Sequence, residues 1–161
     1  MFKVHHLLIE KARRVFANRP DVYWVIGGAC AGKTTLCAAL SVSTGIPVYD
    51  MDAQIFGTFM ERYTQERHPA STAWFTAENP LGWILSLDLT DYDALNRAAN
   101  AEYLDLMADD FTSPECRGSW IVDGGFTHPA VLAEAVPPGQ IITLAASEEI
   151  TAGCWESSKR L

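Results

Sequence analysis

The chain has 161 residues, enough for one domain with a hydrophobic core of its own. Apolar residues make up 48% of it and charged residues 20%, which is ordinary for a globular protein. The net charge of −8 argues against a broad nucleic-acid-binding surface, because such surfaces are rich in Lys and Arg.

The N-terminal residues carry no recognisable targeting signal. They have neither the long apolar core nor the cleavage-site pattern of a secretory signal peptide. No stretch of the sequence approaches the roughly 20 apolar residues that a membrane-spanning helix needs. We therefore expect a single cytoplasmic domain over residues 1–161 that binds neither nucleic acid nor a membrane.

The first third of the chain alternates helix and strand signals. Residues 2–18 have apolar side chains at helical spacing, with Lys and Arg on the other face. Residues 22–26 form a continuous apolar run, which is typical of a buried parallel strand. A second helix is expected over residues 33–42, and a short second strand over residues 46–49 after the turn at Gly45.

A largely helical segment follows. Residues 52–67 have helical spacing, and residues 68–83 are rich in turn formers and aromatic residues, which predicts short helical pieces. Residues 92–111 give the clearest long helix. Residues 53–113 are thus predicted to form a helical insertion that covers or approaches the functional site.

The last third returns to alternation. Strands are predicted over residues 119–122 and 140–145, and helices over residues 129–136 and 147–155. Because strands alternate with helices along the chain, we predict an α/β fold with a parallel sheet. The segment 53–113 then lies between the second and third strands.

One motif stands out, directly after the first predicted strand. Residues 27–35 read GGACAGKTT, the G-x-x-x-x-G-K-T pattern between a strand and a helix. Its glycines let successive backbone N–H groups point into one hollow, and the helix that follows adds its positive end. The motif predicts a nucleoside triphosphate site in which Lys33 reaches the β- and γ-phosphates and Thr34 offers its hydroxyl to Mg²⁺. The predicted binding residues are Gly27, Gly28, Ala29, Cys30, Ala31, Gly32, Lys33, Thr34 and Thr35.

The alternative for the glycine motif at residues 27–35 is a glycine-rich turn with a solvated Lys33.

A second group of polar residues, Asp50 and Asp52, follows the second predicted strand. In a doubly wound sheet, ligands bind beyond the carboxyl ends of the strands, so both carboxylates are expected on the same rim as residues 27–35. One can hold Mg²⁺ or accept a proton from an acceptor hydroxyl, and the other can hydrogen-bond the acceptor. The alternative is a helix N-cap with acidity in the first turn.

These residues carry a family resemblance. The run GGACAGKTTLCAALSVSTGIPVYDMD resembles the start of shikimate kinase and of its gluconate- and adenylate-kinase-like relatives, where a D-x-D pair follows the P-loop lysine. The resemblance implies a P-loop NTPase three-layer sandwich with parallel strand order 2-3-1-4, and ATP and Mg²⁺ as cofactors. It also implies that Asp50 acts near Mg²⁺ or as a base and that Asp52 binds acceptor hydroxyls.

The resemblance extends to the run WIVDGG, which looks like the third-strand element of these kinases. Asp123 stands where P-loop proteins often place the acid that holds the Mg²⁺ shell. Gly124 and Gly125 are expected to let the backbone approach substrate closely. The alternative here is a simple Asp-Gly turn.

The remainder of the chain departs from the family pattern. Residues 53–118 do not match, and they lack the shikimate-binding arginine pattern. The family's lid arginines and final strand have no counterpart before residue 161. Arg62 is a candidate for acceptor binding, with a solvated helix face as its alternative. Trp74 and its aromatic neighbours either close over an acceptor or pack in the core.

The cysteines form no recognisable ligand set. Cys30, Cys37, Cys116 and Cys154 make neither a C-x-x-C pair nor a metal-ligand spacing, so isolated reduced thiols are expected. Oxidation of Cys30 could block nucleotide binding, because it lies inside the glycine motif.

Three functions remain open. The leading prediction is an ATP-dependent kinase for a small hydroxyl- or phosphate-bearing metabolite. Its predicted catalytic residues are Lys33, Asp50 and Asp123, and its predicted metal ligands are Thr34, Asp50 and Asp123. The predicted substrate-binding residues are Asp52, Arg62, Gly124 and Gly125. The alternatives are a nucleotide-binding regulatory NTPase and a truncated P-loop domain without activity. A kinase needs an enclosed polar pocket beside the phosphates.

Some homodimerisation is expected through the exposed edge of the fourth strand.

Overall fold

The computed structural model describes the backbone of residues 1–157 and the side chains of residues 1–154. Four parallel strands form one sheet in the order β2-β3-β1-β4. They are β1 (Val22–Gly27), β2 (Val48–Asp50), β3 (Trp120–Gly124) and β4 (Ile141–Leu144). The α/β class, the parallel sheet and the order 2-3-1-4 are thereby confirmed.

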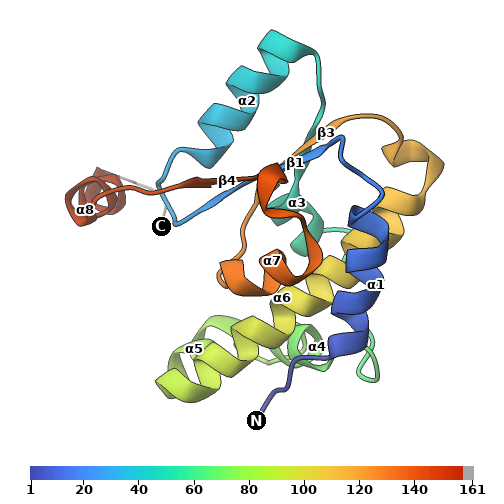
Figure 1. The fold of residues 1–161 in the computed structure, drawn as a ribbon. Helices are drawn as coiled ribbons and strands as arrows, with labels where there is room; N and C mark the ends of the chain where they lie inside the picture. The colour runs from blue at the N-terminus through green and yellow to red at the C-terminus, as the bar shows by residue number, and fades with distance from the viewer. Residues whose placement is uncertain (158–161) are drawn as a thin grey trace.

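Helices cover both faces of this sheet (Figure 1). On one face, α2 (Lys33–Thr44) packs Cys37 against Val25 of β1 and Ile121 of β3. On the other face lie α1 (His6–Phe16), α6 (Leu89–Thr112) and α7 (Pro129–Ala135). The alternation of side chains along a strand explains this division, since Trp24 points to the opposite face from Val25 and meets the ring of Phe16 edge-on at 4.9 Å.

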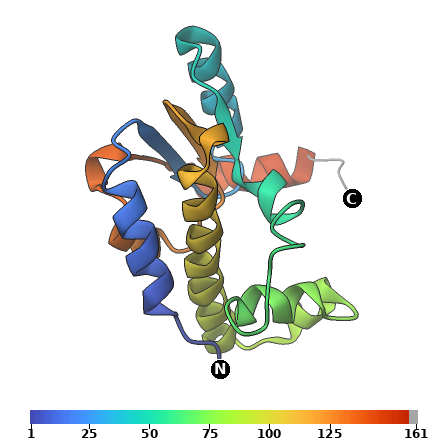
Figure 2. The same ribbon diagram turned by 90° about the vertical axis from the view of Figure 1, so that its right-hand side faces the viewer.

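The helical insertion between β2 and β3 is present. It consists of α3 (Met51–Ile55), α4 (Pro69–Phe75), α5 (Pro80–Ser86) and α6, and a short 3₁₀ turn over Pro114–Cys116 leads into β3. In Figure 2, α4 and α5 lie at the end of the molecule opposite α2. The remaining elements are a 3₁₀ turn over Pro138–Gln140 and α8 (Glu148–Ser157), which projects from the end of β4.

The helix predicted over residues 52–67 is wrong beyond Ile55. The chain continues instead through turns, in which Phe59 N bonds to Gln54 O and Met60 N bonds to Gly57 O. A Cβ added at Gly57 would lie 2.5 Å from Ala53 O, so this tight exit from α3 requires glycine. The turns carry Phe59 into the core, where it is fully buried. Burial of that ring thus overrides the local helical spacing.

Buried carboxylates hold the insertion together. Asp105 on α6 is fully buried and accepts hydrogen bonds from Lys11 Nζ at 2.9 Å and Arg67 Nη2 at 2.7 Å, and its other oxygen lies 3.0 Å from His68 Nε2. Burial alone raises the pKa of Asp105, but the bonds from His68, Arg67 and Lys11 outweigh it and hold the pKa below its usual range. This cluster ties α1 and the 56–68 turns to α6.

A second buried acid, Glu102, performs a similar task one turn earlier on α6. Its two carboxylate oxygens accept the backbone N–H groups of Ala70 at 2.9 Å and Ser71 at 2.7 Å, in the first turn of α4. These N–H groups have no partner within their own helix, so Glu102 satisfies them from a neighbouring one. Together, the two acids hold the 56–68 turns and the start of α4 against α6.

Candidate functional site

Residues 27–35, here called the glycine loop, have the backbone that an anion site requires. Gly32 has a φ of 88° and Gly27 a φ of 151°, and a Cβ added at Gly27 would collide with Leu144 O of β4. Gly32 is the N-cap of α2 and offers no side chain, so the first N–H groups of that helix are left for a ligand. Lys33 Nζ folds back onto Gly28 O at 3.0 Å.

The strongest contact between distant parts of the site joins the glycine loop to β3. Thr34 Oγ1 donates a hydrogen bond to Asp123 Oδ2 at 2.7 Å, although 89 residues separate them in sequence. Asp123 is buried at the end of β3, so its carboxylate is held in place beside the loop. A hydroxyl and a carboxylate side by side are hard oxygen ligands of the kind that Mg²⁺ prefers.

Asp50 and Asp52 lie on the same rim, as predicted for residues after β2. Asp50 is the register partner of Asp123 across the β2–β3 pair. Its Oδ1 accepts the N–H of Ala53 at 3.0 Å, so Asp50 acts as the N-cap of α3, which was the alternative to a role in the site. The remaining oxygen, Oδ2, is not used by that cap.

Asp52 lies beside Gly125, at the border of two cavities. A Cβ added at Gly125 would come within 2.6 Å of Asp52 Oδ1, so the carboxylate lies directly against the Gly125 backbone. Partial burial and the negative charges of Asp50 and Asp123 raise the pKa of Asp52, against the opposing effect of Lys33. A carboxylate with a raised pKa binds a proton more readily than an ordinary one.

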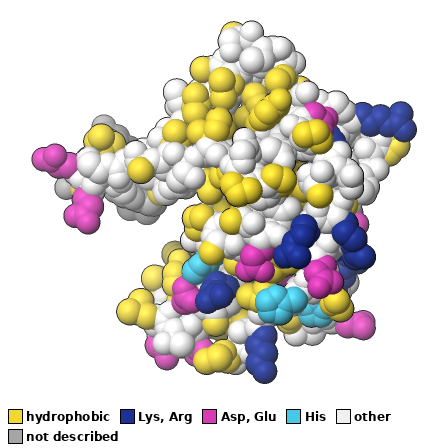
Figure 3. Space-filling model, in the orientation of Figure 1, with side chains coloured by type: hydrophobic (Ala, Val, Ile, Leu, Met, Phe, Trp, Pro, Cys, Tyr) yellow, Lys and Arg dark blue, Asp and Glu magenta, His cyan; other side chains and the backbone are white. Residues whose placement is uncertain are grey.

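Two cavities meet at Asp52. The larger, which we call the loop cavity, has a volume of about 680 Å³ and runs from the glycine loop to the end of β4. Lys33 and Asp52 are the only charged residues among those of the described chain that line it. Figure 3 shows this face of the molecule hollowed between the arm formed by β4 and α8 and the helices below it.

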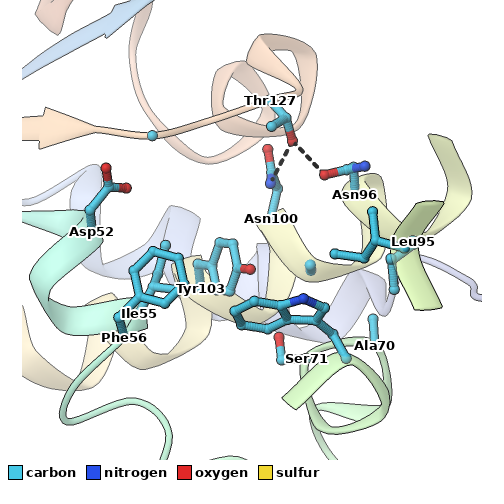
Figure 4. Close-up of a pocket in the computed structure, with 14 residues that line it drawn as sticks. Asp52, Ile55, Phe56, Ala70, Ser71, Leu95, Asn96, Asn100, Tyr103 and Thr127 are labelled. Carbon is cyan, nitrogen blue, oxygen red and sulfur yellow. Dashed lines mark hydrogen bonds between the residues drawn. The ribbon is translucent and has the colours of Figure 1, made fainter. Parts of the chain in front are cut away.

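The smaller cavity, which we call the insertion cavity, has a volume of about 190 Å³. It shares Asp52, Gly125 and Thr127 with the loop cavity. Figure 4 shows Asp52 at one end and Leu95 at the other, with Tyr103 between them. The lining residues are Asp52, Ile55, Phe56, Ala70, Ser71, Trp74, Ile84, Leu95, Asn96, Ala99, Asn100, Tyr103, Gly125 and Thr127.

Hydrogen bonds between polar side chains organise one wall of the insertion cavity. Thr127 Oγ1 donates to Asn96 Oδ1 at 3.3 Å and accepts from Asn100 Nδ2 at 3.2 Å (Figure 4). Asn100 Oδ1 accepts the N–H of His128 at 2.9 Å, and Asn96 Nδ2 donates to Tyr92 O at 2.8 Å. Sequence reasoning missed these residues. The signal was the pair of asparagines four residues apart on a helix that is otherwise apolar on that face.

The other predicted substrate residues are distributed unevenly. Gly125 lies at the junction, whereas Gly124 is buried and a Cβ there would meet Ile26 and Phe126 at 3.2 Å, so its backbone contacts the core. Arg62 is not brought to either cavity. Its guanidinium bonds to Asp110 Oδ1 at 2.7 Å and to Leu106 O at 3.1 Å. Trp74 lines the insertion cavity, where its ring meets Phe56 edge-on at 5.6 Å.

The expectation of isolated reduced thiols is wrong for two of the four cysteines. Cys30, in the glycine loop, forms a disulfide with Cys154 of α8, 124 residues away in sequence. The fold returns α8 to the loop by way of β4, which a sequence spacing does not reveal. Cys37 and Cys116 are free and buried, and burial raises the pKa of both thiols, that of Cys37 to about 11.

Within residues 1–157, no group of three or more His, Cys, Asp or Glu side chains is arranged to hold a metal ion. Mg²⁺ at a nucleotide site commonly takes only one or two protein ligands, with phosphate oxygens and water completing its shell, so this finding does not bear on Thr34 and Asp123. Among the helices of that same range, none is long and apolar enough to cross a bilayer.

Comparison with known proteins does not identify the chain. No family model matches the chain, and neither a curated protein nor a solved structure matches it. The family resemblance is therefore carried by the motifs alone, and the functional argument depends on the geometry of the two cavities.

Proposed function

We propose that the chain is an ATP-dependent phosphotransferase that acts on a small hydroxyl-bearing molecule. The observation that carries the proposal is the meeting of the two cavities at Asp52, with the Thr34–Asp123 pair on the loop side. One cavity has the backbone donors and the lysine that polyphosphate binding needs, and the other can hold a second molecule. A phosphotransferase needs both sites in contact.

The residues that line the loop cavity, together with Thr34 and Asp123 beside it, fit ATP and Mg²⁺. The glycine-loop N–H groups and Lys33 would bind the phosphates, and Thr34 with Asp123 would hold the metal. When bound, ATP would supply the phosphoryl group. Because Lys33 is the one basic residue among the described residues lining this cavity, it carries most of the charge neutralisation in this proposal.

Asp52 is the proposed proton acceptor. The acceptor hydroxyl gives its proton to Asp52 as its oxygen forms a bond to the terminal phosphorus, and the bond from that phosphorus to the bridging oxygen breaks, releasing ADP. Asp52 borders both cavities, while one oxygen of Asp50 is engaged with Ala53 N. Asp50 then has the lesser role of capping α3 and adding negative charge beside the metal ligands.

The regulatory NTPase alternative is less well supported. Such a switch has no need for a second cavity beside the loop, whereas the insertion cavity opens at the same aspartate that borders the loop cavity. The cavity differs from the enclosed polar pocket expected from the sequence, because most of its lining is apolar. That difference bears on the kind of acceptor and is taken up below.

The experiment is a comparison of Asp52→Asn with Asp50→Asn. With an acceptor that the wild-type protein phosphorylates, Asp52→Asn is expected to lower kcat by about 10²–10⁴-fold, the usual contribution of a general base. Mg²⁺·ATP affinity, measured by calorimetry, is expected to stay within about threefold, because Asp52 lines the loop cavity but makes no hydrogen bond to Lys33 or Thr34 within the described residues. Asp50→Asn is expected to change kcat far less, since Asn also caps a helix. Equal losses in the two variants contradict the assignment of Asp52.

A further inference from the structure

We propose that the insertion cavity takes an uncharged molecule with a single-ring-sized apolar body and a hydroxyl group directed at Asp52. Phosphorylated, carboxylate-bearing and polyhydroxylated acceptors are then excluded from it. The inference rests on the proposed function for the phosphoryl transfer itself. The binding claim stands on the cavity alone and is tested separately.

The volume of the cavity limits the size of the ligand. An apolar protein cavity of about 150 Å³ is large enough for benzene. The insertion cavity measures about 190 Å³, so it has room for one ring and a short substituent. Its walls suit a ring, because Phe56, Trp74 and Tyr103 present aromatic surfaces to it and Ile55 and Leu95 add aliphatic ones.

The charge of the lining excludes anions. None of the described lining residues is Lys, Arg or His, and the only charged one is Asp52. A phosphate or carboxylate placed there would be removed from water without a cation and would lie near a negative charge. Two neighbouring arginines are already engaged, Arg62 with Asp110 and Arg67 with Asp105. The cavity has therefore nothing with which to neutralise an anionic acceptor.

The polar groups of the wall are too few for a sugar. Both ends of the Asn96 and Asn100 amides and the Thr127 hydroxyl take part in hydrogen bonds within the protein. The hydroxyls of Ser71 and Tyr103 and the indole N–H of Trp74 are the remaining side-chain polar groups of the lining apart from Asp52. A polyol would leave several hydroxyls unpaired on burial, at a cost for each one. One hydroxyl at Asp52 is what the cavity satisfies best.

The orientation follows from the two ends of the cavity. Asp52 lies at the end that opens to the loop cavity, and Leu95 lies at the other (Figure 4). An apolar ring is buried most fully at the Leu95 end, which directs its hydroxyl to Asp52 and toward the phosphates.

The test is calorimetric binding of three probes to the wild-type chain without nucleotide. 2-Phenylethanol is the predicted ligand type, phenylacetate has the same ring with a carboxylate, and gluconate is an anionic polyol. We expect 2-phenylethanol to bind, phenylacetate to bind at least about tenfold more weakly, and gluconate not to bind. Gluconate or phenylacetate binding more tightly than 2-phenylethanol overturns the inference, and so does the absence of 2-phenylethanol binding.

A matched pair of variants places the ligand. Phe56 lines the cavity and Phe75 does not, and both side chains are exposed, so neither truncation threatens the fold. Phe56→Ala is expected to weaken 2-phenylethanol binding about tenfold, because one aromatic wall is lost. Phe75→Ala is expected to leave it unchanged. Equal affinities in the two variants place the ligand elsewhere and contradict the inference.

Failure of the inference and failure of the proposed function give different results. Binding of 2-phenylethanol without any ADP formation from Mg²⁺·ATP contradicts the proposed phosphotransferase activity but supports the inferred ligand class. Phosphorylation of gluconate with no binding of 2-phenylethanol does the reverse. Stimulation of ADP formation by 2-phenylethanol, lost in Phe56→Ala and kept in Phe75→Ala, supports both.

Discussion

The loop cavity and the insertion cavity share Asp52, Gly125 and Thr127, yet the glycine loop and the insertion cavity are built in opposite ways. The loop is nine consecutive residues whose backbone N–H groups and glycine conformations make the site. The cavity is assembled from side chains of α3, α4, α5 and α6 and of the segment after β3. The first is a property of local sequence, and the second of tertiary packing.

The two regions are also stabilised differently. The glycine loop is held by the Lys33 Nζ bond to Gly28 O, by the Thr34–Asp123 bond at the sheet edge and by the Cys30–Cys154 disulfide. The insertion is held by charges buried against α6, with Asp105 at the centre. The difference teaches that the two sites are separable. Damage to the Asp105 cluster should loosen the acceptor side, while loss of the Lys33 side chain should weaken nucleotide binding without loosening the fold.

The largest expected effect is the loss of stability when the buried Asp105 cluster of the insertion is disrupted. Asp105→Ala leaves Lys11, Arg67 and His68 without their shared acceptor, and we expect the free energy of unfolding to fall by about 3–5 kcal/mol. Asp109→Ala is the matched control, since Asp109 also pairs with Lys11 but is exposed, and the expected loss is about 0–1 kcal/mol. Urea unfolding measures both. Equal losses contradict the view that the buried cluster holds the insertion.

The next effect concerns the link between the loop and α8. Cys154→Ser opens the Cys30–Cys154 disulfide, and we expect the free energy of unfolding to fall by about 2–4 kcal/mol, the typical contribution of a disulfide. Cys116→Ser, which alters a free cysteine, is the control for the substitution itself. Peptide mapping without reductant tests the pairing directly, and recovery of Cys30 and Cys154 as separate thiols contradicts it.

A smaller effect tests the assignment of Asp50 as a cap. Asp50→Ala removes the acceptor for Ala53 N and is expected to cost about 1 kcal/mol of stability. Asp50→Asn keeps a capping oxygen and is expected to be nearly neutral. Thermal unfolding of the two variants provides the comparison. A loss in Asp50→Asn equal to that in Asp50→Ala shows that the negative charge, and not the cap, is what matters.

The smallest effect depends on pH and sharpens the contrast between function and stability. The pKa of Asp52 is raised in the folded chain, so the folded chain binds this proton more tightly than the unfolded chain does. The ionised carboxylate therefore costs stability above its folded pKa, and this cost vanishes as the pH falls below the ordinary value of about 4. Asp52→Asn is expected to have a slightly higher Tm than wild type at pH 7 and an equal Tm near pH 3. A lower Tm at pH 7 contradicts this.

The same division between local sequence and tertiary packing separates the features that the sequence predicts from those that it does not. The strand order was implied by the family resemblance. The buried runs of β1 and β3, the glycine motif and the acidic residues at the end of β2 predicted the parallel sheet and the rim that carries Thr34, Asp123 and Asp52. Each of these signals is local, or follows from the rule that ligands bind at the carboxyl ends of parallel strands. The assignment to P-loop NTPases and the nucleotide chemistry stay predictions.

What the sequence did not reveal depends on contacts between distant residues. The turns after Ile55 arise because Phe59 is drawn into the core. The place of Arg62 is set by Asp110, 48 residues away, and the partner of Cys30 lies near the far end of the chain. The apolar character of the insertion cavity emerges only when α3, α4 and α6 are packed together. None of these features has a local signature.

The measurement that tests the central claim most directly is a calorimetric titration of Mg²⁺·ATP and Mg²⁺·GTP into wild type and Lys33→Ala, each with the Cys30–Cys154 disulfide intact and reduced. Lys3→Ala, an exposed lysine far from the loop in sequence, serves as the control. The account predicts binding to wild type and Lys3→Ala, and affinity at least about tenfold weaker in Lys33→Ala, as expected for one charge-assisted contact to phosphate. A folded wild-type chain that binds neither nucleotide, or a Lys33→Ala variant that binds as tightly as wild type, would contradict the account.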